Sequence, residues 1–188
     1  MKHSPMKKSA LHISLSALCA ALVCLCSWIS IPLGGVPMTL QVFGVAFCGF
    51  LLGARGGASA VAVYLALGAV GLPVFAGFGG SLAFLVGPTG GFLVGFLPLA
   101  IFCGMTPARL TAKKKTALGA VLFPLFGLVL CHIPGVLWFA HVSGVSPAQA
   151  FLVASLPYLP KDVISVLFAR AAARRVMKTK RNLCNPYI

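Results

Sequence analysis

The chain has 188 residues, of which 60% are hydrophobic, and its mean hydropathy is +1.03. This apolar content is well above the roughly 45–50% of a soluble domain, and the length suits a single domain. The 15 basic residues and the single acidic residue give a formal net charge of +14, which in a soluble protein would indicate nucleic-acid binding. Here the charges cluster between apolar runs, a pattern typical of membrane topology, so we expect no nucleic-acid partner.

Six apolar runs predict six transmembrane helices, because a bilayer core takes about 20 helical residues. We place them near residues 10–31, 38–54, 57–72, 88–105, 117–140 and 160–177, followed by a basic tail over 178–188. The second and third runs are short, so their helices would need tilt or local thinning of the bilayer. The first run also resembles a secretory signal, but the spans that follow favour an uncleaved helix. The expected fold is therefore an all-α integral membrane protein.

Positive charge lies almost entirely on one side of this layout. Of the 15 basic residues only Lys161 lies elsewhere, and the three loops of the opposite side carry no Lys or Arg: 32–37, 73–87 and 141–147. Cytoplasmic segments of membrane proteins are enriched in Lys and Arg. We therefore expect a multi-pass protein of the cell membrane, inner or plasma, with both termini in the cytoplasm.

Asp162 is the only acidic residue of the chain and lies in a mostly apolar stretch. An ionised carboxylate is costly there without a partner or a function. Pro157 and Pro160 interrupt the run, and proline is favoured at the first helical position. We therefore expect the last helix to begin at Pro160, with Asp162 in its first turn near the outer mouth, after a short amphipathic or re-entrant segment over 146–156. Asp162 is predicted to bind a ligand, with structural capping of the helix as the alternative.

Lys161 precedes this acid, and one interpretation is that the two charges neutralise each other. Successive side chains of a helix diverge by about 100°, so we expect no tight pair between Lys161 and Asp162.

Small residues recur four positions apart in several predicted spans: Ala17/Ala21, Gly49/Gly53/Gly57 and Gly87/Gly91/Gly95. This spacing lets helix backbones approach closely. The glycines predict packing inside the bundle, whereas the alanine pair is equally suited to a partner membrane protein. The outer segments 31–41 and 71–91 are dense in Gly and Pro, which favours loops that cap a small-molecule pocket.

Patterns typical of catalytic and metal sites are weak. His132 and His141 are nine positions apart and would face opposite sides of one helix, and the cysteines show no C-x-x-C spacing. With one carboxylate no acid–base pair can form, and we expect no Ser-His-Asp constellation. The sequence therefore predicts no catalytic residue, no metal and no cofactor, with His132 hydrogen-bonded inside the bundle.

Four segments occur in one order within residues 17–173: IPLGGVPMTLQVFGVAFCGFLLGARGG, YLALGAVGLPVFAGFGG, GPTGGFLVGF and YLPKDVISVLFA. Together they resemble the BioY family, the biotin-binding S component of energy-coupling factor (ECF) vitamin transporters. The resemblance implies a six-helix S-component fold that captures biotin at the outer face with high affinity, as transported ligand and not as cofactor. It also implies two partners, a transmembrane coupling subunit and a pair of ATP-binding-cassette ATPases, and Ala17 and Ala21 match the family's contact with the coupling subunit.

The resemblance also implies the site residues. The acid of the family's final motif falls on Asp162, whereas Ser165 replaces a Lys that usually follows one turn later, and Lys161 replaces a small residue. Either Lys161, or hydroxyl and backbone N–H groups, would then meet the biotin carboxylate, while Asp162 can accept charge-assisted bonds from N–H groups. The other candidates are polar residues, aromatic residues and glycines near the predicted pocket: Thr39, Gln41, Tyr64, Phe75, Phe78, Gly79, Gly80, Thr89, Gly90 and Tyr158.

Alternatives of two kinds stay open at this point. The same fold would suit another vitamin or a biotin precursor. From other classes, an integral-membrane enzyme would need a base or nucleophile pair that the sequence does not offer, and a structural membrane module would use its glycine faces only for assembly. The chain has no nucleotide-binding motif, so active uptake would need an energising partner, whereas slow transport by the chain alone would not.

Overall fold

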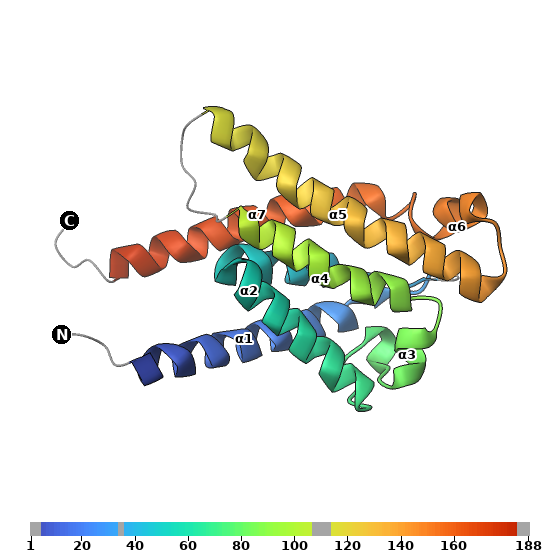
Figure 1. Cartoon of the computed structure of the whole chain (residues 1–188), viewed down its shortest axis with the longest axis horizontal. Coiled ribbons are helices and arrows are strands. Elements are labelled where there is room, and N and C mark those ends of the chain that lie inside the picture. Colours follow the sequence, from blue (N-terminus) through green and yellow to red (C-terminus); the bar gives the residue numbers. More distant parts are fainter. Residues whose placement is uncertain (1–4, 34–35, 107–113, 184–188) are drawn as a thin grey trace.

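The computed structural model describes residues 5–33, 36–106 and 114–183. As predicted, the fold is built of helices, and five of them are long: α1 (Pro5–Trp28), α2 (Gln41–Ala69), α4 (Gly90–Met105), α5 (Lys114–Ser143) and α7 (Leu159–Leu183). The short elements are β1 (Ser30–Ile31), β2 (Met38–Thr39), the 3-10 turn η1 (Ala76–Phe78), α3 (Leu82–Val86) and α6 (Pro147–Ala154) (Figure 1). Part of the charge that predicts the orientation, in residues 1–4 and 107–113, lies outside the described residues.

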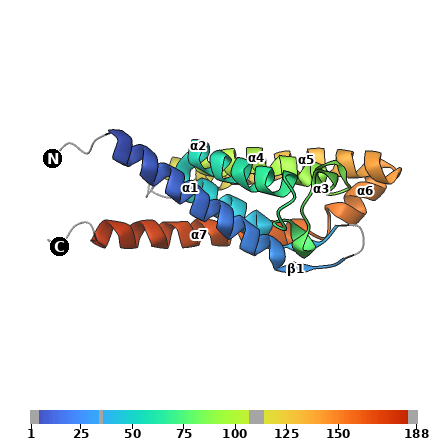
Figure 2. The same cartoon turned by 90° about the horizontal axis from the view of Figure 1, so that it is seen from below.

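The long helices pack around α2 and α4. α4 lies between α2 and α5, while α1 and α7 pack against α2. In Figure 2, α2, α4 and α5 form one layer above α7, and α1 runs obliquely from the level of that layer down toward β1. α1 begins and α7 ends at the same end of the elongated molecule, and η1, α3, α6 and the ribbon of β1 and β2 gather toward the other end (Figures 1 and 2). The loop-rich segments of the sequence therefore meet at one end of the bundle.

α2 consists of two helices that meet at Gly53. The φ of Gly53 is +78°, a conformation that L side chains rarely adopt. A Cβ on Gly57 would lie 2.7 Å from the Cα of Gly49, although eight positions of a straight helix span about 12 Å. The chain therefore folds back at Gly53. The predicted spans 38–54 and 57–72 correspond to the two halves of α2, with the break slightly earlier than predicted.

The remaining spans agree with the prediction in position but not always in length. Spans 10–31, 88–105 and 117–140 correspond to α1, α4 and α5. α1 ends at Trp28 because Ser30 and Ile31 pair with Thr39 and Met38 in an antiparallel ribbon. Among the described residues, two helices are long and apolar enough to cross a membrane, or three if the bent pair of α6 and α7 counts as one, and two shorter apolar helices accompany them. These helices are those expected of a membrane protein.

The C-terminal region confirms the proline-based prediction. α7 begins at Leu159 with Asp162 in its first turn, and α6 is a separate helix inclined to it by 54°. Ser146 and Gln149 form a capping box at the start of α6, in which each side chain accepts a hydrogen bond from the other residue's backbone N–H, so that α6 is stabilised independently of α7. α7 extends past residue 177, the predicted end of the last span, into the predicted basic tail and ends at Leu183.

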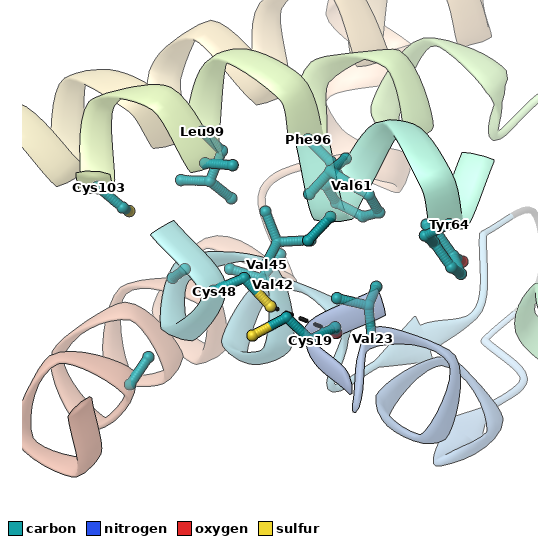
Figure 3. Packing of buried hydrophobic residues seen from close by; sticks show 14 of the residues in the cluster. Cys19, Val23, Val42, Val45, Cys48, Val61, Tyr64, Phe96, Leu99 and Cys103 are labelled. Carbon is teal, nitrogen blue, oxygen red and sulfur yellow. Dashed lines mark hydrogen bonds between the residues drawn. The ribbon is translucent and has the colours of Figure 1, made fainter. Parts of the chain in front are cut away.

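Glycines lie at the close contacts between α2, α4 and α5, as their spacing predicts. A Cβ on Gly49 would meet the carbonyl of Ala100 and lie 2.9 Å from the Cβ of Cys103, and one on Gly95 would lie 2.7 Å from the carbonyl oxygen of Cys131. Gly53 differs, because a Cβ there would meet nothing within 4 Å and its role is the reversal of α2. The interior that results is apolar, with Val42, Val45, Val61, Phe96 and Leu99 between α2 and α4 (Figure 3).

We expect Gly49→Ala to destabilise the bundle, because its methyl group would push α4 away from α2. Overpacking of this kind costs about 1–3 kcal/mol, which corresponds to a loss of roughly 5 °C in melting temperature for a chain of this size. Thermal unfolding of the detergent-purified chain measures it. Gly119→Ala is the matched control, because a Cβ there meets only the Phe123 side chain at 3.8 Å. Equal melting temperatures for the two variants would contradict the packing role of Gly49.

Candidate functional site

A cavity lies at the end of the bundle where the short elements gather. Its volume open to the centres of water-sized spheres is about 120 Å³, roughly ten times the 10–15 Å³ that one water needs, so it is on the scale of a small organic ligand. Its lining is mostly apolar and comes from α2, α3, α4, α5, α6, α7 and the segments between them: Val36, Pro37, Thr39, Gln41, Val42, Phe75, Ala76, Phe84, Thr89, Phe92, Leu93, Phe96, Cys131, His132, Ala154, Tyr158, Lys161 and Asp162.

The structure brings most of the predicted polar and aromatic residues to this cavity. Seven of them line it: Thr39, Gln41, Phe75, Thr89, Tyr158, Lys161 and Asp162. Tyr64 lies directly behind the wall, fully buried, with its hydroxyl against the Gln41 amide. The sequence pattern missed the apolar lining, such as Phe92 and Phe96, because a buried aromatic residue near a cavity has the same sequence signature as one in the core.

Other predicted residues lie elsewhere. Ser165 is buried but lines a separate groove with Leu40 and Phe43. Phe78 is 64% exposed and its ring packs on Trp28, with the centroids 5.2 Å apart. Gly79, Gly80 and Gly90 are absent from the cavity wall; a Cβ on them would overlap the Phe84 ring, the Leu72 carbonyl and the Leu85 carbonyl. These glycines therefore allow close packing of the capping segment, and ligand contact is not their observed role.

Asp162 and Lys161 form an ion pair, so the expectation that they do not pair is wrong. Lys161 Nζ lies 2.5 Å from Asp162 Oδ1 and also donates a hydrogen bond to the backbone carbonyl of Thr39 at 2.6 Å. The argument from helical geometry applies to the direction of the Cβ atoms, but the long lysine stem can fold back from that direction. The carbonyl of Thr39 provides a second anchor for the ammonium group.

His132 contacts the other oxygen of the same carboxylate. Its Nε2 lies 3.3 Å from Asp162 Oδ2, and its Nδ1 lies 2.8 Å from the hydroxyl of Ser155. The prediction that His132 is hydrogen-bonded in the bundle is confirmed, and the folded chain also places Ser155, His132 and Asp162 in a row that no sequence pattern indicated. No spacing rule connects these residues, because α5, the α6–α7 connection and α7 meet only in the folded chain. Ser155 is fully buried and does not line the cavity, so its hydroxyl is not placed to attack a bound molecule.

Asp162 is therefore held on both sides, by Lys161 at Oδ1 and by His132 at Oδ2. Only 5% of its side chain is exposed, and an ionised carboxylate has about four acceptor positions, more than these two contacts use. Buried polar atoms normally have a hydrogen-bond partner, and a carboxylate accepts strongly from N–H groups. The arrangement suits a ligand that offers an N–H donor to Asp162.

A second polar group, next to the Lys161–Asp162 pair, also lines the cavity. The Thr39 hydroxyl donates to Gln41 Oε1 at 2.8 Å, and Gln41 Nε2 donates to the Tyr64 hydroxyl at 2.5 Å. These contacts use one of the two amide hydrogens of Gln41 and hold the amide plane in place. The cavity thus combines an amide, an ammonium group and a carboxylate with apolar walls, which is the usual composition of a binding pocket.

The predicted capping segments do close this end of the cavity. Phe75 is buried and packs edge-on against Tyr64, with ring centroids 5.4 Å apart. Trp28 Nε1 donates to the carbonyl of Pro73 at 2.9 Å, and the Tyr158 hydroxyl donates to the carbonyl of Val36. The segment before α2 is thus hydrogen-bonded to the residue that precedes α7, and the segment before η1 and α3 is hydrogen-bonded to α1.

Two further predictions concern partners and metals. Ala17 and Ala21 are both exposed on α1, while Ala20 between them is buried against the core, so the pair faces outward. Within the described residues, no group of three or more His, Cys, Asp or Glu side chains is arranged to hold a metal ion.

Comparison with known proteins relates this arrangement to one family. The model of the BioY family matches residues 1–182. The biotin transporter BioY of Thermotoga maritima is 40% identical over 161 residues, covering 84% of this chain and 90% of that protein. The probable biotin transporter BioY of Pyrococcus horikoshii is 38% identical over 167 residues, covering 89% and 96%. A crystal structure of the S-component for biotin from an ECF-type ABC transporter is similar with a TM-score of 0.82 and 27% identity, over 94% of this chain and 95% of that one. The chain belongs to the BioY family.

Proposed function

We propose that this chain is the biotin-binding S component of a vitamin uptake transporter and captures biotin in the cavity at the outer end of the bundle. The observation that carries the proposal is the carboxylate of Asp162, buried in the wall of a mostly apolar cavity, with Lys161 and His132 each against one of its oxygens. Biotin offers two ureido N–H donors, an apolar bicyclic ring, an aliphatic chain and a carboxylate. Family membership supports the choice of biotin over another vitamin or a biotin precursor.

The ureido group of biotin is the partner that we assign to Asp162. An N–H donor meeting an ionised carboxylate makes a charge-assisted hydrogen bond, which is stronger than a neutral one. Thr89 and Gln41 supply further polar contacts, and Phe75 and Tyr158 cover the apolar body. Lys161 is assigned to the biotin carboxylate. Since the ureido and carboxylate groups are at opposite ends of biotin, Lys161 would have to extend away from Asp162 to reach it.

The membrane arrangement that we propose has six spans and cytoplasmic termini in a single transmembrane domain of the cell membrane. The spans are α1, the two halves of α2, α4, α5 and α7 with α6. Basic residues lie at the start of α1 and along the end of α7, and the elements η1, α3 and α6, which contribute to the cavity wall, lie toward the other end of the molecule in Figure 1. The positive-inside rule supports a cavity that opens to the outside.

An ECF coupling subunit and a pair of ABC ATPases are the proposed partners, since the chain carries no nucleotide-binding motif. Ala17 and Ala21 face outward from α1 at a spacing that lets another helix approach closely. We assign this pair to the coupling subunit.

We expect Asp162→Asn to weaken biotin binding by roughly 10- to 100-fold, because hydrogen bonds to a charged group are worth about 1.5–3 kcal/mol. Isothermal titration of the detergent-purified chain with biotin measures the affinity, and uptake by cells expressing the variant should fall in parallel. Ile164→Ala is the matched control in the same turn of α7, because Ile164 is 66% exposed and lies outside the cavity.

Unchanged affinity in Asp162→Asn would remove this residue from the site. The same titration with dethiobiotin, thiamine and riboflavin as competitors tests the ligand itself. Displacement of biotin by a competitor that binds more tightly would replace biotin as the assigned ligand.

Lys161→Ala is expected to weaken biotin more than biotin methyl ester, because only the free acid offers the lysine an anion. A lost contact between two charged groups predicts a difference of about tenfold or more in dissociation constant. Binding of both ligands to the variant and to the unchanged chain gives the comparison. Equal losses for the acid and the ester would show that Lys161 serves Asp162 and not the ligand carboxylate.

Ala21→Trp should abolish energised uptake while leaving biotin affinity of the isolated chain within about twofold, because a bulky side chain blocks close helix approach on α1. Co-purification with the coupling subunit and titration with biotin separate the two effects. Val129→Trp is the control, since Val129 is 48% exposed on α5, on the far side of the bundle from α1 (Figure 1). Retained co-purification of Ala21→Trp would contradict the assigned surface.

A further inference from the structure

With a neutral His132, the formal charges around the cavity sum to zero only while no anion is bound. Among the described lining residues, Lys161 carries a positive charge, Asp162 a negative one, and His132 can carry either one positive charge or none. With a neutral His132 the formal sum is zero. A ligand with a carboxylate adds one negative charge to an apolar site, where an unbalanced charge is costly because the surroundings solvate it poorly.

His132 is the group best placed to supply the missing positive charge. Its Nε2 is 3.3 Å from Asp162 Oδ2, and only 9% of its side chain is exposed. Imidazole is the side chain that ordinarily changes charge between pH 5 and 8. If Lys161 extends toward a ligand carboxylate, His132 is the only described side chain still in contact with Asp162 that can carry a positive charge.

Ser155 makes both protonation states of His132 acceptable in the same geometry. The Ser155 hydroxyl lies 2.8 Å from His132 Nδ1. A hydroxyl can donate to Nδ1 of the neutral ring and accept from the N–H of the charged ring. The imidazole can therefore gain a proton without leaving a buried polar atom unpaired, and the side chains need not rearrange.

No other described group near His132 competes for this role. On α4 the nearest ring is Phe92, whose centroid is 5.8 Å away and which carries no charge. α6 contains no titratable residue, and the α6–α7 connection contributes Tyr158, which is neutral near pH 7, as is Cys131 on α5. Asp162 and Lys161, both on α7, complete the titratable groups that share the cavity wall with His132.

We propose that His132 takes up a proton from solvent when the cavity binds an anionic ligand, so that binding is coupled to protonation. The inference rests on the proposed function in that biotin is the anion. In this role His132 is a positioning residue: it holds the carboxylate of Asp162 through Oδ2, while the added proton balances the ligand carboxylate.

The sign of the pH effect follows from the direction of proton transfer. When the complex binds more protons than the free protein, affinity rises as pH falls, with a limit of tenfold per pH unit for one proton. The carboxylate of biotin is ionised throughout pH 6–8, as carboxyl groups titrate near pH 4. We therefore expect biotin affinity to fall by about tenfold between pH 6 and 8, and the affinity for the neutral methyl ester to stay within about twofold.

Isothermal titration of the full chain in two buffers with different heats of ionisation, phosphate and Tris, counts the protons directly. At pH 7.5 we expect uptake of between about half and one proton for biotin, and none for biotin methyl ester. His132→Gln keeps an amide N–H for Asp162 Oδ2 but cannot take up a proton, so it should bind both ligands without uptake and without pH dependence. His141→Gln is the matched control, since His141 is exposed on the same helix and lies outside the cavity, and it should retain the uptake.

Equal heats of biotin binding in the two buffers for the unchanged chain would overturn the inference, whether or not His132→Gln folds. Equal uptake with the ester, or uptake that persists in His132→Gln, would overturn it as well. These outcomes differ from failure of the proposed function, which would be seen as an absence of biotin binding at every pH.

Discussion

The ion pair between Asp162 and Lys161, braced by His132, is the interaction on which the site depends. A lone carboxylate in an apolar bundle is tolerated only when it is paired, and here each oxygen faces a different cationic or protonatable group. The cluster connects the start of α7 to α5 and, through the Lys161–Thr39 contact, to the start of α2. Because its members come from both layers of the bundle, the packing of those layers determines the geometry of the pocket.

That packing in turn depends on glycine. α4 approaches both α2 and α5 at positions where a Cβ would meet backbone or Cβ atoms of the neighbour, as at Gly49 and Gly95. Between helices in a membrane, association relies on close packing because lipid is as apolar as the side chains. The close approach leaves space for the cavity at the end of the bundle, where loops and short helices replace the long ones. There the polar groups of Thr39, Gln41 and Tyr64 form a network of their own.

The Ser155–His132–Asp162 row is arranged for binding and not for nucleophilic attack. The hydroxyl is buried at the far side of the imidazole and does not line the cavity, whereas the carboxylate at the other end of the row does. In a catalytic Ser-His-Asp triad, the end of the row that faces the cavity is the serine. In this chain it is the acid, and the histidine and serine behind it hold the acid in position.

Local patterns along the chain were enough to predict the helical class, the positions of the long apolar helices, the start of α7 near Pro160 and the placement of Asp162 in its first turn. These features depend on local hydrophobicity, on the backbone limits of proline and on the spacing of glycines, all of which are readable along the chain. Only the tertiary structure decided that Lys161 folds back onto Asp162, that His132 and Ser155 stand behind the acid, and that Ser165 faces another groove. The physical reason is that flexible side chains and residues from separate helices meet according to packing, which no periodicity within a single segment records.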